Sequence, residues 1–167
     1  MVKRIYVQKK SGFDVEAKGL LGDLKENLLI DNLEDVIMLN RYDVEGITDE
    51  VFEKAKNTVF SEPQVDLCFE EEYSFEKEDK VFGVEYLPGQ FDQRANSLSE
   101  CLQILTEGAR PVSKSAKIYV LKGNLSAEDV EKSIYTQSKK EVNRVDPSKE
   151  DSTQNARAGM EGMGEMS

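Results

Sequence analysis

The chain has 167 residues, with 33 acidic and 22 basic side chains and no histidine, so its formal charge is −11. This length corresponds to one domain or to two closely packed halves, and 38% hydrophobic residues suffice to fill a core. The acidic excess argues against nucleic acid and against anionic membranes as partners, because both require basic surfaces. The lack of histidine excludes Ser-His-Asp and Cys-His catalytic sites and histidine-based metal sites.

The N-terminus runs from Met1 directly into strand-like sequence, without the apolar segment of a signal peptide. No stretch approaches the ~20 apolar residues of a membrane span. We therefore expect a soluble, cytoplasmic protein. Cys68 and Cys101 each lie among apolar residues, which indicates small buried side chains rather than a redox pair or a disulfide framework.

The first half of the chain predicts the order strand, helix, strand, helix, strand. Strands are assigned from alternating or continuous apolar runs, and helices from apolar residues at three- and four-residue spacing. Thr48 fits a helix N-cap and Pro63 ends that helix. The expected strands cover 3–8, 35–42 and 65–69, and the expected helices cover 17–28 and 48–59. The acidic run over 70–79 indicates a solvated loop or hairpin tip.

The second half repeats this order at a nearly constant offset along the chain. Ser97 and Glu100 fit a capping box that opens a helix closed by Gly108, and Ser126 fits the N-cap of the next helix. The expected strands cover 81–87, 116–121 and 141–146.

This repetition predicts an α+β fold made of duplicated ferredoxin-like halves, about 1–75 and 76–150, that form an intramolecular pseudo-dimer. Helical crossovers favour right-handed βαβ units with the helices on one side, so we expect the two open sheet faces to bury each other. Residues 151–167 lack periodicity and apolar clusters, which predicts a disordered tail. A methionine-rich stripe that binds a partner is the alternative interpretation of that tail.

Two polar clusters are candidate sites. Gln90, Asp92, Gln93 and Arg94 lie between a strand and a helix, where loops often carry function. Arg41 and Tyr42 lie at the end of another strand. A turn followed by a helix that Asp92 or Asn96 could cap explains the first cluster structurally, and an exposed strand end with a surface Arg–Asp pair explains the second. The chain contains no phosphate-binding glycine motif and no calcium-loop spacing, so the residues indicate no catalytic set and no metal site.

Several strings of residues resemble one known domain. They are Val-Lys-Arg-Ile-Tyr-Val over 2–7, Gly-Phe-Asp-Val-Glu-Ala over 12–17, Leu-Asn-Arg-Tyr-Asp-Val-Glu-Gly over 39–46, Val-Phe-Ser-Glu-Pro over 59–63 and Val-Glu-Tyr-Leu-Pro-Gly-Gln-Phe-Asp-Gln-Arg-Ala over 84–95. Together they resemble the N-terminal domain of large, single-chain phosphoribosylformylglycinamidine synthase, the ATP- and glutamine-dependent ligase of purine biosynthesis. The similarity runs over about 2–135. In that family this PurS-like domain resembles two fused copies of a small subunit, in agreement with the duplication.

The resemblance implies a non-catalytic structural module, as a fragment of a ligase that converts formylglycinamide ribonucleotide to formylglycinamidine ribonucleotide. Its partners would be the synthetase and glutaminase domains, which hold the family's catalytic residues, ATP and magnesium; this chain would hold no cofactor. Gln90, Asp92, Gln93 and Arg94, with Arg41 and Tyr42, are the expected interdomain contacts. A free-standing binding or regulatory module is the alternative, and an autonomous enzyme that uses Asp92 is a third hypothesis.

Overall fold

The computed structural model describes residues 1–138 and 142–145, so the predicted tail lies outside the described residues. The described elements alternate strand and helix twice in the same order. They are β1 (Val2–Lys9), α1 (Val15–Glu26), β2 (Leu33–Glu45), α2 (Asp49–Lys56), β3 (Asp66–Glu70), β4 (Lys80–Tyr86), α3 (Gln93–Thr106), β5 (Val112–Gly123), α4 (Ala127–Ser138) and β6 (Val142–Val145). The predicted α+β class and order of elements are confirmed.

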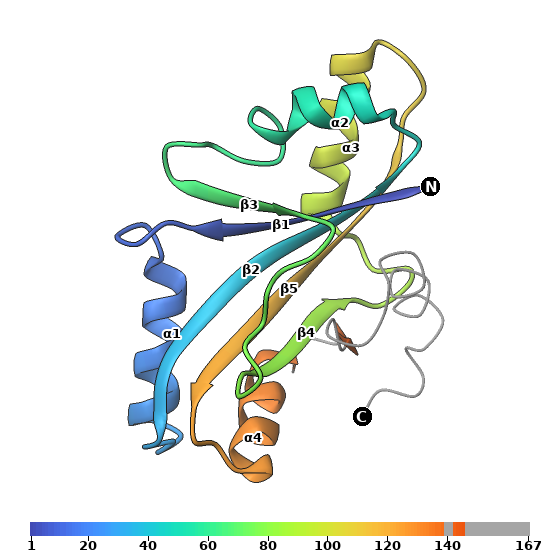
Figure 1. Cartoon of the computed structure of the whole chain (residues 1–167). Helices are drawn as coiled ribbons and strands as arrows, with labels where there is room; N and C mark the ends of the chain where they lie inside the picture. The colour runs from blue at the N-terminus through green and yellow to red at the C-terminus, as the bar shows by residue number, and fades with distance from the viewer. Residues whose placement is uncertain (139–141, 146–167) are drawn as a thin grey trace.

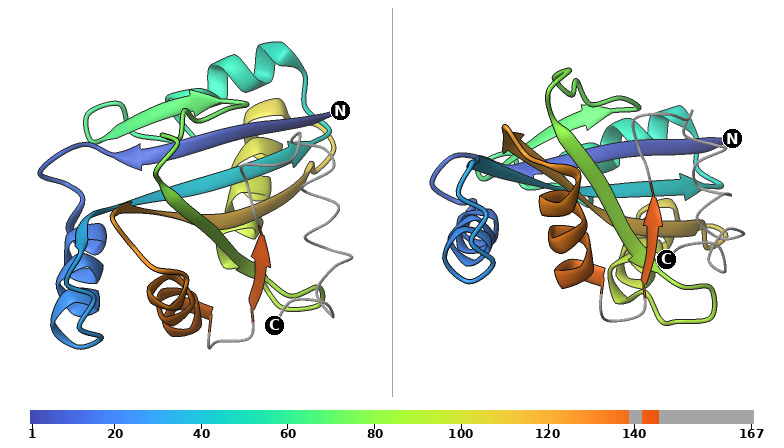
Figure 2. Two further views of the ribbon diagram at one scale, coloured as in Figure 1. Left: turned by 60° about the horizontal axis from the view of Figure 1, so that its bottom comes forward. Right: turned by 90° about the horizontal axis from the view of Figure 1, so that it is seen from below.

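The six described strands form one sheet in the order β3-β1-β2-β5-β4-β6 (Figure 1). Every pair of neighbours is antiparallel, so the expected βαβ units occur only in split form. β2 and β3 run parallel on either side of β1 and are joined through α2, and β5 and β6 flank β4 in the same way, joined through α4. β2 and β5 pair along almost their whole length, from Leu33–Gly123 to Glu45–Val112, and both views of Figure 2 show them side by side. The two halves therefore join edge to edge in one sheet, and the expected face-to-face burial of two sheets is wrong. The long strands β2 and β5 form backbone hydrogen bonds with each other at this junction.

The sheet order has an internal regularity. Counted from either outer edge toward the junction, each half contributes its third, first and second strand. The β2–β5 pair thus lies at the centre, and β3 and β6 form the two edges.

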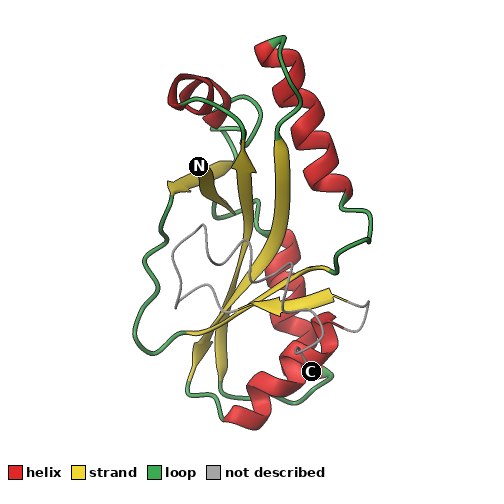
Figure 3. Ribbon diagram, turned by 90° about the vertical axis from the view of Figure 1, so that its right-hand side faces the viewer, coloured by secondary structure: helices red, strands yellow, loops and turns green. Residues whose placement is uncertain are grey.

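All four helices pack on one face of the sheet, which we call the helix face. Phe52 of α2 and Leu98 of α3 pack with Tyr42 of β2, whereas Leu24 of α1 and Ile134 of α4 pack with Val36 of the same strand. Tyr42 and Val36 are an even number of positions apart on one strand, so their side chains lie on the same face. Figure 3 shows the consequence, with the helices in two groups at opposite ends of the long strands.

The other face, the open face, has an apolar cluster of its own. Tyr6, Leu39 and Ile118 are buried there under Tyr73 and Phe75. The segment between β3 and β4 is therefore more than the expected solvated loop, because its aromatic residues pack on the sheet while its acidic residues Glu72 and Glu76 remain exposed.

Two local expectations need correction. α3 begins at Gln93 with Asp92 as its N-cap, so the cap expected at Asp92 is confirmed and the capping box expected at Ser97 is wrong. Cys101 is exposed on α3, whereas Cys68 is half-buried, so the prediction of a buried side chain fails for Cys101. The caps at Thr48 and Ser126 are confirmed, since each side-chain oxygen accepts a hydrogen bond from the backbone N–H three residues later. No helix among the described residues is long and apolar enough to cross a membrane.

Candidate functional site

The six residues predicted as contacts do not form one site. Tyr42 lies on the helix face, and its neighbour Arg41 lies on the open face, because successive side chains of a strand point to opposite sides. Both side chains are buried, so neither is an exposed contact. The turn that joins β4 to α3 and the first turn of that helix carry the other four, and of these Arg94 is hydrogen-bonded to Tyr42.

Gln90 and Asp92 serve the local structure. Gln90 accepts a hydrogen bond at Oε1 from the Leu87 backbone N–H over 2.8 Å, which closes the turn in which Gly89 has a φ of +91°. Asp92 accepts from the Ala95 N–H over 2.9 Å at the start of α3. It also accepts from Ser115 of β5, from the backbone N–H over 3.1 Å and from the hydroxyl over 2.8 Å. Asp92 therefore fixes α3 to the centre of the sheet.

Replacing Asp92 with alanine should lower the free energy of unfolding by about 1–3 kcal/mol. The variant loses the N-cap of α3, worth about 1 kcal/mol, and leaves the Ser115 hydroxyl and N–H without their acceptor. Ser97→Ala is the matched control and should change stability by less than about 0.5 kcal/mol, because Ser97 is exposed inside the helix. Urea unfolding followed by circular dichroism compares the two. A larger loss of stability for Ser97→Ala than for Asp92→Ala would contradict this and favour the capping box predicted at Ser97.

Gln93 and Arg94 remain accessible at the first turn of α3. Arg94 Nη1 donates a hydrogen bond to the Tyr42 hydroxyl over 3.3 Å. Partial enclosure lowers the pKa of Arg94, but this hydrogen bond and the nearby charges of Glu16 and Asp92 outweigh that effect and raise the pKa above its ordinary value. Arg94 is therefore a permanent cation held in place by a neutral partner.

Arg94 lines a cleft on the helix face, which we call the central cleft. It consists of two adjoining cavities of about 580 and 420 Å³ that share Glu16, Asn40 and Arg94 in their walls. Cavities of this size are typical of binding sites. Glu16 comes from α1 and Arg94 from α3, so the cleft lies where the two groups of helices separate.

The floor of the central cleft is a row of residues paired across four strands. Val7 pairs with Asn40, Asn40 with Lys117, and Lys117 with Val84. Lys117 Nζ lies 3.0 Å from Glu16 Oε2, and both side chains are at least one-third exposed. Asn40, Glu16 and Lys117 are not among the site residues predicted from the sequence. The signal was present, since Asn40 and Lys117 are polar residues at positions where their strands otherwise face the helices.

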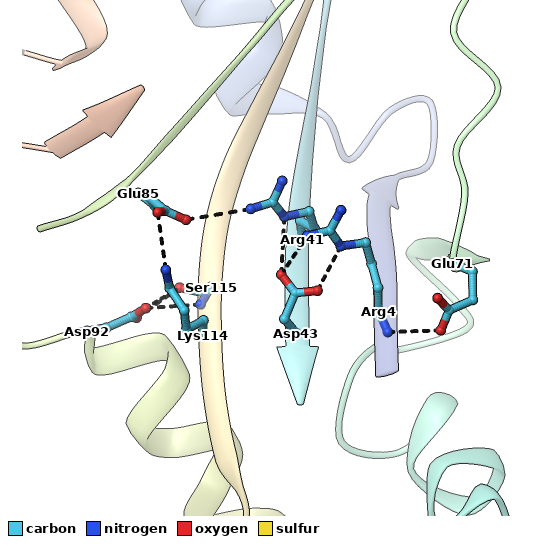
Figure 4. Close-up of polar contacts among 8 residues, drawn as sticks. All are labelled: Arg4, Arg41, Asp43, Glu71, Glu85, Asp92, Lys114 and Ser115. Carbon is cyan, nitrogen blue, oxygen red and sulfur yellow. Dashed lines mark hydrogen bonds and ion pairs between the residues drawn. The ribbon is translucent and has the colours of Figure 1, made fainter. Parts of the chain in front are cut away.

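The open face carries a chain of charged side chains from four strands (Figure 4). Arg4 donates two hydrogen bonds to Asp43, over 2.7 and 3.0 Å. Arg41 Nε lies 3.4 Å from Asp43, and its Nη2 lies 3.6 Å from Glu85. Lys114 donates to Glu85 over 3.1 Å. We call these five residues the buried charge network.

The buried charge network contradicts the surface ion pair expected at Arg41 and Asp43. Arg41 is 1% exposed and Asp43 is 4% exposed. Among the described residues, Arg41 Nε and Nη1 and Glu85 Oε2 have no hydrogen-bond partner. Burial lowers the pKa of Arg41, and the charge of Arg4 acts in the same direction. Burial also raises the pKa of Glu85, against the opposing charges of Lys114 and Arg41.

The raised pKa of Glu85 gives folding a defined dependence on pH. A carboxyl group whose pKa is higher in the folded chain binds its proton more tightly there, so its contribution to stability is present below the ordinary glutamate pKa of ~4.3. That contribution is lost as the pH rises through the folded pKa. Glu85→Gln lacks this titration, so its stability relative to wild type should rise as the pH increases above about 4. Urea unfolding of both proteins at each pH tests this, and a constant difference would contradict it.

No group of three metal-ligating side chains is present in the described part of the chain. No protein-family model, curated protein or solved structure matches the chain. The resemblance to the N-terminal domain of formylglycinamidine synthase therefore remains a prediction from the strings of residues.

Proposed function

We propose that the chain is a non-catalytic structural module of a phosphoribosylformylglycinamidine synthase, built from duplicated ferredoxin-like halves. Its role is to dock on the synthetase domain and to help couple that domain to the glutaminase domain. The catalytic residues, the ATP and the magnesium belong to those domains. The observation that carries this proposal is the mirrored sheet order, in which each half places its third, first and second strand from the edge to the junction. Such an order is what two fused copies of one small subunit would give.

The position of the Pro-Gly-Gln-Phe-Asp-Gln-Arg string also supports the proposal. Gln90 and Asp92 form the turn and fix α3, whose first two residues, Gln93 and Arg94, are exposed. Phe91 is 69% exposed and Tyr86 is 45% exposed, next to the accessible Arg94. Aromatic residues and arginine are enriched at the centres of protein interfaces, whereas a lone turn needs none of them. The expected contacts thus narrow to Gln93 and Arg94, with Tyr42 as the buried support of Arg94.

Replacing Arg94 with alanine should weaken docking about thirty-fold or more. Removing one partner of a paired charge at an interface typically costs about 2–5 kcal/mol of binding free energy. The stability of the isolated chain should change by less than about 0.5 kcal/mol, because Arg94 is exposed there. Isothermal titration calorimetry with the synthetase and glutaminase domains of a single-chain synthase, supplied as one separate protein, measures the affinity.

Arg110→Ala is the matched control, because Arg110 is also exposed and is hydrogen-bonded only locally in the described structure, to Asn96. It should bind the separate domains like the wild type. Equal affinities for wild type and Arg94→Ala would mean that the string forms only a turn and a helix cap and that Arg94 is not an interface contact. A wild-type chain that does not bind these domains at all would contradict the proposed function and favour a free-standing binding module.

A further inference from the structure

We infer that the start of α1 is a second docking surface, where Phe13 enters an apolar pocket of the synthetase domain and acts as the counterpart of Phe91 at the start of α3. The identity of the partner rests on the proposed function, whereas the surface is a property of the isolated chain. Three observations carry the inference: a short internal repeat, the exposure of its two phenylalanines and the position of both copies beside the central cleft.

A five-residue pattern recurs at the start of the first helix of each half. Residues 13–17, the first string, are Phe-Asp-Val-Glu-Ala, and residues 91–95, the second string, are Phe-Asp-Gln-Arg-Ala. In both strings the aspartate is the N-cap of the helix and the alanine is buried. A glycine with a positive φ precedes each string, Gly12 at +93° and Gly89 at +91°. The two halves therefore begin their first helices in the same way, with a phenylalanine directly before the cap.

The local fold does not explain either phenylalanine. Phe13 is 53% exposed and Phe91 is 69% exposed. An apolar residue directly before an N-cap often packs on the fourth residue of the helix, but that residue is Lys18 in α1 and Asn96 in α3. Within the described part of the chain, neither phenylalanine belongs to one of the three apolar clusters. Aromatic side chains that are exposed and that the fold does not use are typical of interface contacts.

The two strings border the central cleft from opposite halves. Asn40 and Lys117 pair with each other at the middle of the floor, and each also pairs with a valine of the first strand of its own half. An approximate twofold axis through this pair therefore relates the halves. Phe13 lines the larger cavity and Arg94 lines both. Figure 1 shows α1 and α3 running away from each other, so a partner that covers the cleft meets the starts of both helices.

The exposed groups of the first string favour an apolar partner surface. Val15 is 75% exposed, so this string presents a second apolar side chain besides its phenylalanine. Removing such side chains from water is favourable when the surface that covers them is also apolar. The charges beside them are already paired within the chain, Glu16 with Lys117 and Lys18 with Asp35. A charged group of the partner would therefore gain little there.

Replacing Phe13 with serine should weaken docking about ten-fold or more, because truncation removes most of the buried surface of an aromatic anchor. Phe91→Ser should have an effect of similar size, and the two factors should multiply in the double variant because the residues lie on different elements. Isothermal titration calorimetry with the separate synthetase and glutaminase domains measures both. The melting temperature of each variant should stay within about 2 °C of wild type.

Ile104→Ser is the matched control, because Ile104 is 77% exposed but lies at the end of α3 that is remote from the cleft. Its affinity should stay within about two-fold of wild type, as for most residues outside a hot spot. Hydrogen exchange provides a footprint of the first string. The first N–H groups of a helix lack intrahelical acceptors, so the amides of Val15 and Glu16 should exchange quickly in the isolated chain and slowly in the complex.

Wild-type affinity for Phe13→Ser together with weaker binding by Phe91→Ser would overturn the inference and leave the proposed function intact. Unchanged exchange of the Val15 and Glu16 amides in the complex would have the same meaning. A wild-type chain that does not bind the domains would refute the proposed function and, with it, the partner assigned to Phe13. Sedimentation of the isolated chain tests the remaining occupant, since self-association that Phe13→Ser abolishes would make a second copy the partner and overturn the inference.

Discussion

Replacing Asp43 with asparagine should lower the free energy of unfolding by about 3–5 kcal/mol, the range for breaking a buried ion pair. Asp43 is the carboxylate that Arg4 and Arg41 share, and all three side chains are at most 4% exposed. Asparagine keeps the size of the side chain but removes the charge, so two guanidinium groups would lie in the interior without it. Their desolvation would no longer be offset, which makes this a larger effect than the loss of hydrogen bonds alone.

Urea unfolding at pH 7 measures this change, and Glu50→Gln provides the matched control. Glu50 pairs with Lys54 over 3.7 Å on the surface of α2, with both side chains at least 66% exposed, so its loss should cost less than about 0.5 kcal/mol. A cost below about 1 kcal/mol for Asp43→Asn would mean that water reaches the buried charge network and screens the two arginines.

The buried charge network also explains how the two halves of the chain are held in register. Its members come from β1, β2, β4 and β5, and so it crosses the β2–β5 junction. Arg41 reaches from β2 to Glu85 of β4, and Lys114 of β5 reaches the same carboxylate. An ion pair of this kind adds little net stability compared with apolar packing, but a register shift would leave its charges buried and unpaired. We therefore expect it to select one pairing of the halves.

The sequence predicted the elements well because their signals are local. Each strand and helix has its own apolar period, and the caps at Thr48 and Ser126 are readable from a few residues. The arrangement of the strands depends on contacts between distant segments. One signal for it was available: the runs over 36–39 and 118–121 are apolar at successive positions. Such runs are typical of central strands covered on both faces, and these two strands are the ones that pair at the junction.

The candidate site was predictable only in part, for the same reason. Asp92 and Ser97 are both acceptable N-caps by residue type, and the choice between them is made by Ser115, which lies on a distant strand and donates to Asp92. The role of Arg41 was similarly hidden. Its alternation with Tyr42 places the two on opposite faces, but its partner Glu85 becomes apparent only once β4 and β5 are paired.

Replacing Gly123 with alanine should destabilise the fold by about 2–5 kcal/mol, combining backbone strain with overpacking. Gly123 ends β5 opposite Leu33, with a φ of +136°, a conformation that other residues rarely adopt. A Cβ atom there would lie 2.1 Å from the Asn32 carbonyl oxygen and 3.1 Å from the Glu34 nitrogen. Both atoms are backbone, so the clash can be relieved only by separating the strands at the junction.

Gly19→Ala is the control with the opposite expected sign. Gly19 lies inside α1, and an added Cβ atom would meet nothing within 4 Å, so alanine should stabilise the chain by about 0.5–1 kcal/mol through its higher helix propensity. Thermal unfolding of both variants provides the comparison, with the two melting temperatures expected on opposite sides of the wild-type value. An unchanged melting temperature for Gly123→Ala would show that the strands can separate at this end of the β2–β5 pair at little cost. The two halves would then be held together by the middle of the junction and by the buried charge network.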